Sequence, residues 1–366
     1  MKKYVLLMFA MLLLAVGIGS VFIGCAGEEK GATLIGIAMP ETHVERWRKD
    51  GESLKEYAMD MGYKAEVVFG DADQSKQNKQ IEDLITKGAK LIIVGSVNEG
   101  VAEAVSKAKE EGVIIIAYDR LITNSDAYDY YITFDNFKVG QLQGEAIVEA
   151  LSLSAGDGKN ITLFAGAPTD NNAFVFFDGA MDILSPYVSN GGLKIIGPNP
   201  LSSKDSSFTK ITTENWMAEK AKNRMENLLS SDASGVVLDA VLAPNDTLAR
   251  AIIEVMLSDE KYLSNIPVAT GQDGEIASIK MIRDGKQYMT VFKDTRSLAK
   301  ATIQLADDLL AGKMPSVDGA RVDSESYDTG KKVVTSYLLE PVRVTKDNYK
   351  AIMIDSGYYT QDQIDN

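Results

Sequence analysis

A run of five apolar residues in the first half of the chain constrains the fold most. Gly112 ends a charged, helix-like segment, and residues 113–117 then read Val-Ile-Ile-Ile-Ala. An uninterrupted apolar run of this length is typical of a parallel β-strand that is buried on both faces. The run ends abruptly at Tyr118-Asp119-Arg120. An acid and a guanidinium therefore stand at the carboxyl end of a buried strand, where open α/β sheets bind their ligands. A surface ion pair is the alternative interpretation.

Strand-like and helix-like segments alternate along the chain. In the first part, strand and helix patterns follow one another at residues 33–39, 44–61, 65–69, 74–87, 91–94, 101–111 and 113–117. After a short strand at 130–134 the rhythm starts again, with patterns at 138–151, 161–165, 173–184, 193–196, 216–229, 236–242, 247–257, 267–271, 275–284 and 287–292. Such alternation predicts right-handed βαβ units and parallel sheets covered on both faces. The sequence therefore predicts an α/β protein with two doubly wound parallel-sheet lobes.

The amino terminus has the pattern of a secretory signal. Two lysines precede residues 5–23, which are almost entirely apolar and carry no charge. The run ends at a glycine followed by Cys25, the only cysteine, and this arrangement resembles a bacterial lipobox, although Phe22 stands where leucine is usual. We therefore expect a lipoprotein signal peptide at 1–24, lipid on the Cys25 sulfur and a tether at 25–32. An uncleaved transmembrane anchor is the alternative, because the run is long enough to span a membrane.

The length of the mature chain also favours two lobes. About 340 residues remain after residues 1–24, which is more than one ordinary core holds. No low-complexity linker separates the two halves, so several short crossings between lobes are favoured over two independent units. The helix pattern at 298–310 has no place in the second lobe, and we expect it to return to the first.

Net charge and missing motifs exclude several functions. Without residues 1–24 the chain keeps 36 of its 38 Lys and Arg and all 52 Asp and Glu, so its net charge is 36 minus 52, or −16. This charge repels phosphate-rich partners, and no basic run with interleaved aromatics offsets it, so nucleic acid is excluded. The chain has no P-loop, no G-x-G-x-x-G motif and no Cys/His cluster for zinc, so we expect no cofactor and no metal.

Polar residues stand just past the expected strand ends in both lobes. They are Arg46, Trp47, Asp119 and Arg120 in the first lobe, Asp170, Asn171, Asn172, Asn245, Asp246, Gln272 and Asp273 in the second, and Lys293 after the crossing strand. Two such rims facing one another predict a polar cleft for a small molecule between lobes. Carboxylates accept, cations donate and amides do both, so the set suits the hydroxyl groups of a polyol. Trp47 and one of Phe174, Phe176 or Phe177 are candidates to sandwich a pyranose ring.

Each of these residues also has a purely structural interpretation. Trp47 and most of the phenylalanines are compatible with the core, since only one or two residues of a helical cluster can point outward. Asp170, Asn171 and Asp246 stand where helix caps are expected, because Asx side chains satisfy free amides at helix starts. The coincidence of five polar clusters at equivalent strand ends favours a binding site.

Several motifs together carry a family resemblance. They are Glu45-Arg46-Trp47, Ala117-Tyr118-Asp119-Arg120, Phe134-Asp135-Asn136, Asp170-Asn171-Asn172-Ala173, Asn245-Asp246, Gly271-Gln272-Asp273 and Phe292-Lys293. They resemble the periplasmic pentose- and hexose-binding proteins of ABC importers, the type I periplasmic binding proteins, and within them the multiple-sugar receptors and xylose-binding proteins. The similarity extends over residues 34–363.

The resemblance implies roles and boundaries. The residues that it implies as sugar ligands are Arg46, Asp119, Arg120, Asp170, Asn172, Asn245, Asp273 and Lys293, with Trp47 and Phe176 as stacking residues and Trp216 as a further aromatic near the sugar. It also implies three crossings, which we place near residues 136, 293 and 330. The expected first lobe is then 33–136 plus 294–330, and the second is 137–293 plus 331–366. Residues 198–215 depart from the family pattern, and they border the expected pocket.

The expected function is capture of one monosaccharide by hinge closure. The sugar is an aldose such as glucose, galactose, xylose or arabinose, and the expected partner is an ABC permease. We expect a monomer that is lipid-anchored at the outer face of the cytoplasmic membrane or in the periplasm. A sensor that presents sugar to a chemoreceptor or sensor kinase is an alternative. A glycoside-processing enzyme using paired carboxylates such as Asp170 and Asp273 is another. His43 is the only histidine, and we expect it in an exposed loop near the cleft.

Overall fold

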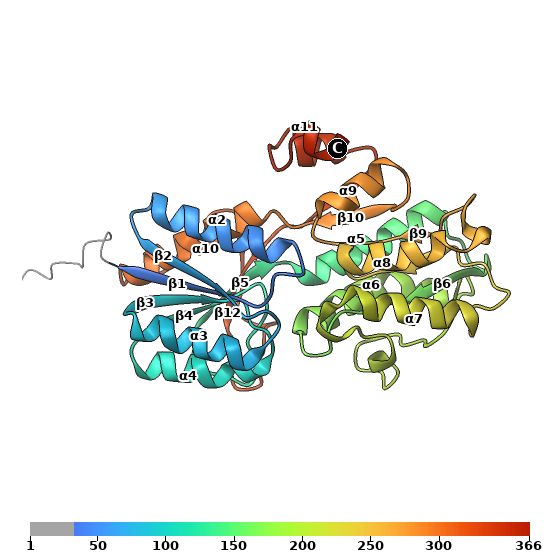
Figure 1. The fold of residues 1–366 in the computed structure, drawn as a ribbon. Helices are drawn as coiled ribbons and strands as arrows, with labels where there is room; N and C mark the ends of the chain where they lie inside the picture. The colour runs from blue at the N-terminus through green and yellow to red at the C-terminus, as the bar shows by residue number, and fades with distance from the viewer. Residues whose placement is uncertain (1–32) are drawn as a thin grey trace, which may run out of the picture.

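The computed structural model describes residues 33–366. The expected signal peptide, the lipidation site Cys25 and the tether lie outside these residues. Two lobes lie side by side in Figure 1, the first around β1 to β5 and the second around β6 to β10. No helix within residues 33–366 is long and apolar enough to cross a membrane.

The first lobe is built on a seven-stranded sheet. Its strand order is β11 (Arg321–Asp323), β12 (Thr335–Leu339), β5 (Tyr130–Phe134), β4 (Ile114–Tyr118), β3 (Ala89–Val94), β1 (Leu34–Met39) and β2 (Lys64–Phe69). Only β11 pairs antiparallel. Helices α2 (Arg46–Asp60) and α10 (Thr295–Leu310) cover one face, and α3 (Gln74–Thr86) and α4 (Ala102–Glu110) cover the other (Figure 1). Helices on both faces leave β1, β3 and β4 almost wholly buried, which explains their continuous apolar runs.

The second lobe has a smaller parallel sheet. Its strand order is β7 (Leu193–Ile195), β6 (Lys159–Leu163), β8 (Ala240–Leu242) and β9 (Val268–Ala269). A separate two-stranded sheet, β10 (Met289–Phe292) antiparallel to β13 (Val342–Thr345), joins this sheet through a parallel bridge between Gln272 and Val291. The helices are α5 (Asn136–Leu151), α6 (Asn171–Ser189), α7 (Ala218–Ser230), α8 (Asp246–Leu257), α9 (Ile276–Arg283) and the short α11 (Gln361–Asp365). The predicted fold class is confirmed by this architecture.

Two glycines let helices α5 and α6 pack with their backbones almost touching. A Cβ atom added at Gly140 would lie 1.9 Å from the Phe176 carbonyl oxygen, and one added at Gly179 would lie 2.1 Å from the Phe137 carbonyl oxygen. Any side chain at either position would therefore push the helices apart. Because α6 begins at the cleft, this contact sets where its first turn presents Asn172 and Phe176.

The chain crosses between the lobes three times. The crossings join β5 to α5, β10 to α10, and β12 to β13. The third differs from the sequence-based placement near residue 330, which is wrong because β12 pairs in parallel with β5 inside the first sheet. The crossing therefore falls after Leu339, and β11 and β12 both belong to the first lobe. Helix α10 packs beside α2 in the first lobe, as its sequence pattern predicted.

Candidate functional site

A cavity lies between the two lobes, at the carboxyl ends of their strands. The space between the side chains, counted together with the solvent open to it, is about 290 Å³. Its walls are formed by Val44, Arg46, Trp47, Asp119, Arg120, Asp170, Asn172, Phe176, Trp216, Asn245, Gln272, Asp273 and Lys293. All eleven residues that the sequence nominated as sugar ligands or stacking groups are thus brought together here.

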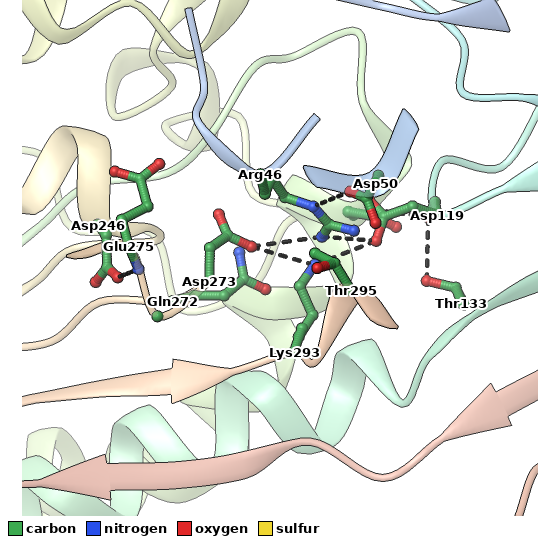
Figure 2. Close-up of polar contacts among 12 residues, drawn as sticks. Arg46, Asp50, Asp119, Thr133, Asp246, Gln272, Asp273, Glu275, Lys293 and Thr295 are labelled. Atoms are coloured by element: carbon green, nitrogen blue, oxygen red, sulfur yellow. Dashed lines mark hydrogen bonds and ion pairs between the residues drawn. The ribbon is translucent and has the colours of Figure 1, made fainter. Parts of the chain in front are cut away.

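Arg46 stands at the first turn of α2 and connects three carboxylates (Figure 2). Its Nε lies 2.9 Å from Asp50 Oδ2, and its Nη1 lies 2.8 Å from Asp119 Oδ2 and 3.4 Å from Asp273 Oδ1. The first two acids belong to its own lobe, whereas Asp273 belongs to the other. Its second terminal nitrogen, Nη2, is buried and has no hydrogen-bond partner within residues 33–366. That nitrogen is a donor left over for a ligand.

Asp119 follows β4 with a φ of 58°, so the chain turns sharply as it leaves the strand. Its Oδ2 lies 3.3 Å from Lys293 Nζ as well as next to Arg46. Burial by itself would raise the pKa of Asp119, but Arg46, Lys293 and Arg120 outweigh burial and bring the pKa below its ordinary value. The carboxylate is therefore ionised at neutral pH, so it can accept hydrogen bonds from hydroxyl groups but cannot give them a proton.

Arg120 spans the cleft. Its Nη2 lies 2.8 Å from Glu41 Oε1 in the same lobe, and its Nε lies 2.9 Å from Asp170 Oδ2 in the other. Its Nη1 also donates to the Ser96 carbonyl oxygen at 3.0 Å. Burial lowers the pKa of Arg120, but the carboxylates of Asp170 and Glu41 raise it above its ordinary value. The guanidinium is therefore a permanent cation that holds the two rims together.

In the second rim, the side chains that cap helices also line the cavity. Asp170 Oδ1 accepts from the Asn172 backbone N–H at 2.9 Å at the start of α6, while Oδ2 accepts from Trp216 Nε1 at 3.1 Å and faces Arg120. Asn245 Oδ1 accepts from the Leu248 N–H at 3.1 Å at the start of α8. Asp170 and Asn245 thus cap helices and also line the cavity. Asn171 lines a separate groove instead of this cavity.

Lys293 and the Gln272–Asp273 turn close the cavity near the hinge. Lys293 follows β10, is almost fully buried, and has its Nζ 3.3 Å from Asp119 Oδ2 and 3.6 Å from Asp273 Oδ1. Figure 2 shows this amine between the two acids, one from each lobe. Gln272 Oε1 is buried and has no partner within the described residues. Gln272 Oε1 and Arg46 Nη2 are therefore a buried acceptor and a buried donor in the cavity walls that pair with no other atom of residues 33–366.

Three aromatic side chains complete the walls. The guanidinium groups of Arg46 and Arg120 each lie 5.0 Å from the Trp47 ring centroid. Phe176 and Trp216 meet edge to face, with ring centroids 6.5 Å apart. The other two phenylalanine candidates do not line the cavity: Phe174 and Phe177 each pack against Phe208 in the core of the second lobe, 5.1 Å between centroids.

Trp216 reaches the cavity through an unusual turn. Residues Asn215 and Trp216 both have positive φ, 50° and 55°, so α7 begins only at Ala218 and not at 216 as expected. The indole lies so close to Gly166 that a Cβ atom there would be 1.9 Å from Trp216 Cη2. The turn and Gly166 together place the indole edge over Asp170.

Three residues that support this site were not among the predicted ligands. Glu41 follows the end of β1, a rim position like the others, so its place was a usable signal. Asp50 lies four residues after Arg46 on α2, a spacing that predicts a contact. Gln272 was placed on the rim but not nominated as a ligand.

Within residues 33–366 no group of three or more His, Cys, Asp or Glu side chains is arranged to hold a metal.

Two further contacts join the lobes outside the cavity. His43 Nε2 lies 3.0 Å from the Asn215 carbonyl oxygen across the cleft and 3.1 Å from Glu41 Oε2. Both partners can only accept, so this ring nitrogen carries the hydrogen. Lys49 Nζ donates to Tyr359 Oη at 2.6 Å on the hinge side. The structure is thus that of a closed cleft.

Comparison with known proteins shows which family the chain belongs to. A model of the periplasmic binding protein domain matches residues 35–314. The chain belongs to the periplasmic binding protein family. This binding protein is 41% identical to the multiple sugar-binding periplasmic receptor of Rhizobium radiobacter, over 96% of this chain and 97% of that protein. It is 34% identical to the D-xylose-binding periplasmic protein of Escherichia coli, over 90% of this chain and 92% of that protein.

A solved structure supports the fold and the family. The binding protein superposes with a TM-score of 0.83 on an ABC transporter solute-binding protein from Clostridium phytofermentans, which was determined with bound β-D-glucose. The two are 41% identical, and the match covers 91% of this chain and 100% of the other. The family resemblance inferred from the rim motifs is therefore confirmed.

Proposed function

We propose that this binding protein captures one aldose in its pyranose form and delivers it to an ABC importer. The observation that carries the proposal is the cavity itself, in which charged groups from both lobes converge beside three aromatic side chains. Charged donors and acceptors make stronger hydrogen bonds to hydroxyls than neutral groups do. The aromatic walls suit the C–H faces of a sugar ring. The relatives named for sugar binding, and the one solved with glucose, support the same ligand class.

The arrangement of the lining residues favours a monosaccharide. Arg120, Asp170 and Lys293 line one cavity between the two rims, so the hydroxyls of a single ring could meet groups from both lobes. An oligosaccharide needs an open groove with successive aromatic platforms. We therefore propose glucose, galactose, xylose or arabinose as the class of ligand, with micromolar or tighter affinity.

Binding works as a shift of population from open to closed lobes. Only the closed state places both rims on the ligand at once, so the sugar stabilises that state. In the closed structure Arg120 bonds directly to Asp170, and Arg46 lies 3.4 Å from Asp273. A bound sugar would insert its hydroxyls among these ion pairs and use the free Arg46 Nη2 and Gln272 Oε1.

A glycoside-processing enzyme fits the site less well. General acid catalysis requires a carboxyl group that donates a proton to the leaving oxygen. The oxygens of Asp170 already accept from Asn172, Trp216 and Arg120. Asp119 has a lowered pKa and faces cations. We therefore propose that no chemistry is done on the sugar.

A thermal-shift screen tests the ligand class. The panel contains aldopentoses, aldohexoses, hexuronic acids and disaccharides, because a ligand that binds only the folded protein raises its melting temperature. We expect one or more neutral aldoses to give the largest shifts. Tight binding only to disaccharides or to non-sugars would contradict the proposal.

We further propose that the mature protein is a lipoprotein that begins at Cys25 and is held at the outer face of the cytoplasmic membrane. Two or more acyl chains give stable anchoring where a single chain is marginal. Replacing Cys25→Ser should release the protein from membranes or leave the signal uncut. Mass spectrometry that finds an unmodified mature Cys25 would count against the anchor without affecting the sugar proposal.

A further inference from the structure

A buried carboxylate lies directly behind the rim of the second lobe. Asp246 is the first residue of α8, follows the cavity residue Asn245, and is completely buried. It is not among the residues that line the cavity. The proposed function therefore gives it no direct contact with sugar.

Three hydrogen-bond donors from two separate segments converge on this carboxylate. The backbone N–H of Glu275, at the start of α9, donates to Oδ2 at 2.9 Å. The Thr290 hydroxyl on β10 donates to the same oxygen at 3.0 Å, and Gln287 Nε2 donates to Oδ1 at 2.9 Å. A carboxylate can accept all three, whereas an asparagine side chain would turn one acceptor into a donor that faces other donors. Figure 2 shows Asp246 next to Glu275 and Gln272.

The same residue anchors the loop that carries two cavity groups. The Asp246 backbone N–H donates to the Gln272 carbonyl oxygen at 2.9 Å. A Cβ atom at Gly271 would lie 2.2 Å from Asp246 Oδ1, so the loop rests against the carboxylate. Asp273 in this loop has a φ of 97°, a left-handed conformation that a non-glycine residue keeps only where its surroundings enforce it. The contacts of Asp246 are part of that enforcement.

We propose that Asp246 is a positioning residue for ligand binding, holding residues 271–275 so that the Asp273 carboxylate and the Gln272 amide face the cavity. The inference rests on the proposed sugar-binding function and concerns the same site. It assigns a role to a residue that never contacts the sugar. Asp246 acts through Asp273, whose carboxylate reaches Lys293 and Arg46 across the cleft.

A double-mutant cycle tests this role. Sugar affinity is measured by calorimetry for the full-length mature protein, for Asp246→Asn, for Asp273→Ala and for the double variant. We expect Asp246→Asn to weaken binding about tenfold or more in the wild-type background, but only about threefold or less when Asp273 is already alanine, because interacting sites are not additive. A purely structural role would cost the same factor in both backgrounds.

Two more variants keep the test decisive. Thr290→Val removes one donor to Asp246 with little change of shape. If Asp246→Asn does not fold, a double-mutant cycle of Thr290→Val with Asp273→Ala distinguishes a positioning role from a purely structural one. Thr162→Val is the matched control, because Thr162 is a buried threonine of β6 whose hydroxyl has no partner within residues 33–366, and it should leave affinity unchanged. Unchanged affinity in Asp246→Asn and Thr290→Val, or equal factors in both backgrounds, overturns the inference. A wild-type protein that binds no aldose contradicts the proposed function and the inference with it.

Discussion

The two rims of the cleft are built from different chemistry. In the first lobe, the charged groups pair within their own lobe: Arg46 pairs with Asp50 and Asp119, and Arg120 pairs with Glu41. In the second lobe, the polar groups that line the cavity are acids and amides from helix caps and a tight turn, and the described residues include no arginine or lysine there apart from Lys293 at the crossing.

Because of this difference, substitutions in the two rims should have different effects on folding stability and on sugar affinity. When the cleft opens, Arg46 keeps Asp50 and Arg120 keeps Glu41, so the first rim stays assembled for the next ligand. The second rim keeps its backbone contacts because its side chains also terminate helices. A substitution in the first rim should therefore act mainly on affinity, whereas one in the second rim should act on affinity and folding together.

Removal of Arg120 should have the largest effect. Arg120→Ala leaves Asp170 and Glu41 without their cation in a buried site, a loss of roughly 2–5 kcal/mol for a desolvated charged pair. Sugar affinity measured by calorimetry should fall about 100-fold or more. The melting temperature of the sugar-free protein should change much less, because water enters the open cleft. Arg120→Lys keeps the positive charge but loses the forked nitrogens of the guanidinium. Its sugar affinity should lie between those of the wild type and Arg120→Ala. Near-normal sugar affinity in Arg120→Ala would show that the first rim does not act mainly on affinity.

A cap variant sharpens the contrast in the second lobe. Asp170→Ala removes both the partner of Arg120 and the cap of α6, so affinity should fall at least tenfold and the cap should cost about 1 kcal/mol of folding stability. Asp170→Ser keeps a capping oxygen and should restore the melting temperature but not the affinity. Equal recovery of both quantities by serine would show that Asp170 acts on sugar binding only through the helix.

Buried acids of the two lobes should also respond to pH with opposite sign. Burial raises the pKa of Asp246 well above its ordinary value of 3.8, and the neighbouring Glu275 carboxylate adds to this. The folded state then holds the proton more tightly than the unfolded state, so stability increases as pH falls toward 3.8, by at most about 1.4 kcal/mol per pH unit. Asp119 has a lowered pKa, so its contribution is lost only when pH falls below its ordinary value.

Melting curves of the sugar-free protein check the sign. As pH falls toward 3.8, the wild-type protein should gain stability relative to Asp246→Asn, which cannot take up that proton. Asp71→Asn serves as a control, because Asp71 is exposed and has a lowered pKa. Parallel pH curves for the wild type and Asp246→Asn would contradict the account of the buried second-lobe acid.

The contact between His43 and Asn215 should have the smallest effect. His43→Ala removes one partly exposed hydrogen bond that forms only when the lobes close. A neutral hydrogen bond contributes about 0.5–1.5 kcal/mol, so affinity should weaken about threefold to tenfold through faster sugar release. Stopped-flow release rates measure this directly. An unchanged release rate would show that closure depends on the rims alone.

Much of the fold and of the candidate site could be predicted because the sequence signals for them are local. Buried strands read as apolar runs, and the rim residues follow strand ends, so the eleven nominated residues came together as expected. The third crossing was misplaced because Thr335–Leu339 pairs with a strand about 200 residues earlier, and nothing within its five residues selects that neighbour. The left-handed turn at Asn215–Trp216 carries no glycine to mark it. Asp246 was not predicted as a supporting group because its burial depends on tertiary packing, whereas the helical spacing of Asp50 from Arg46 was a usable signal.

A crystal structure of the protein with D-glucose or D-xylose would show whether both lobes hold one sugar between them. We expect one pyranose ring in the cavity, with hydroxyls at hydrogen-bonding distance from Arg120 and Asp119 of the first lobe and from Asp170 or Asp273 of the second. A sugar held by one lobe only, or bound outside this cavity, would contradict it.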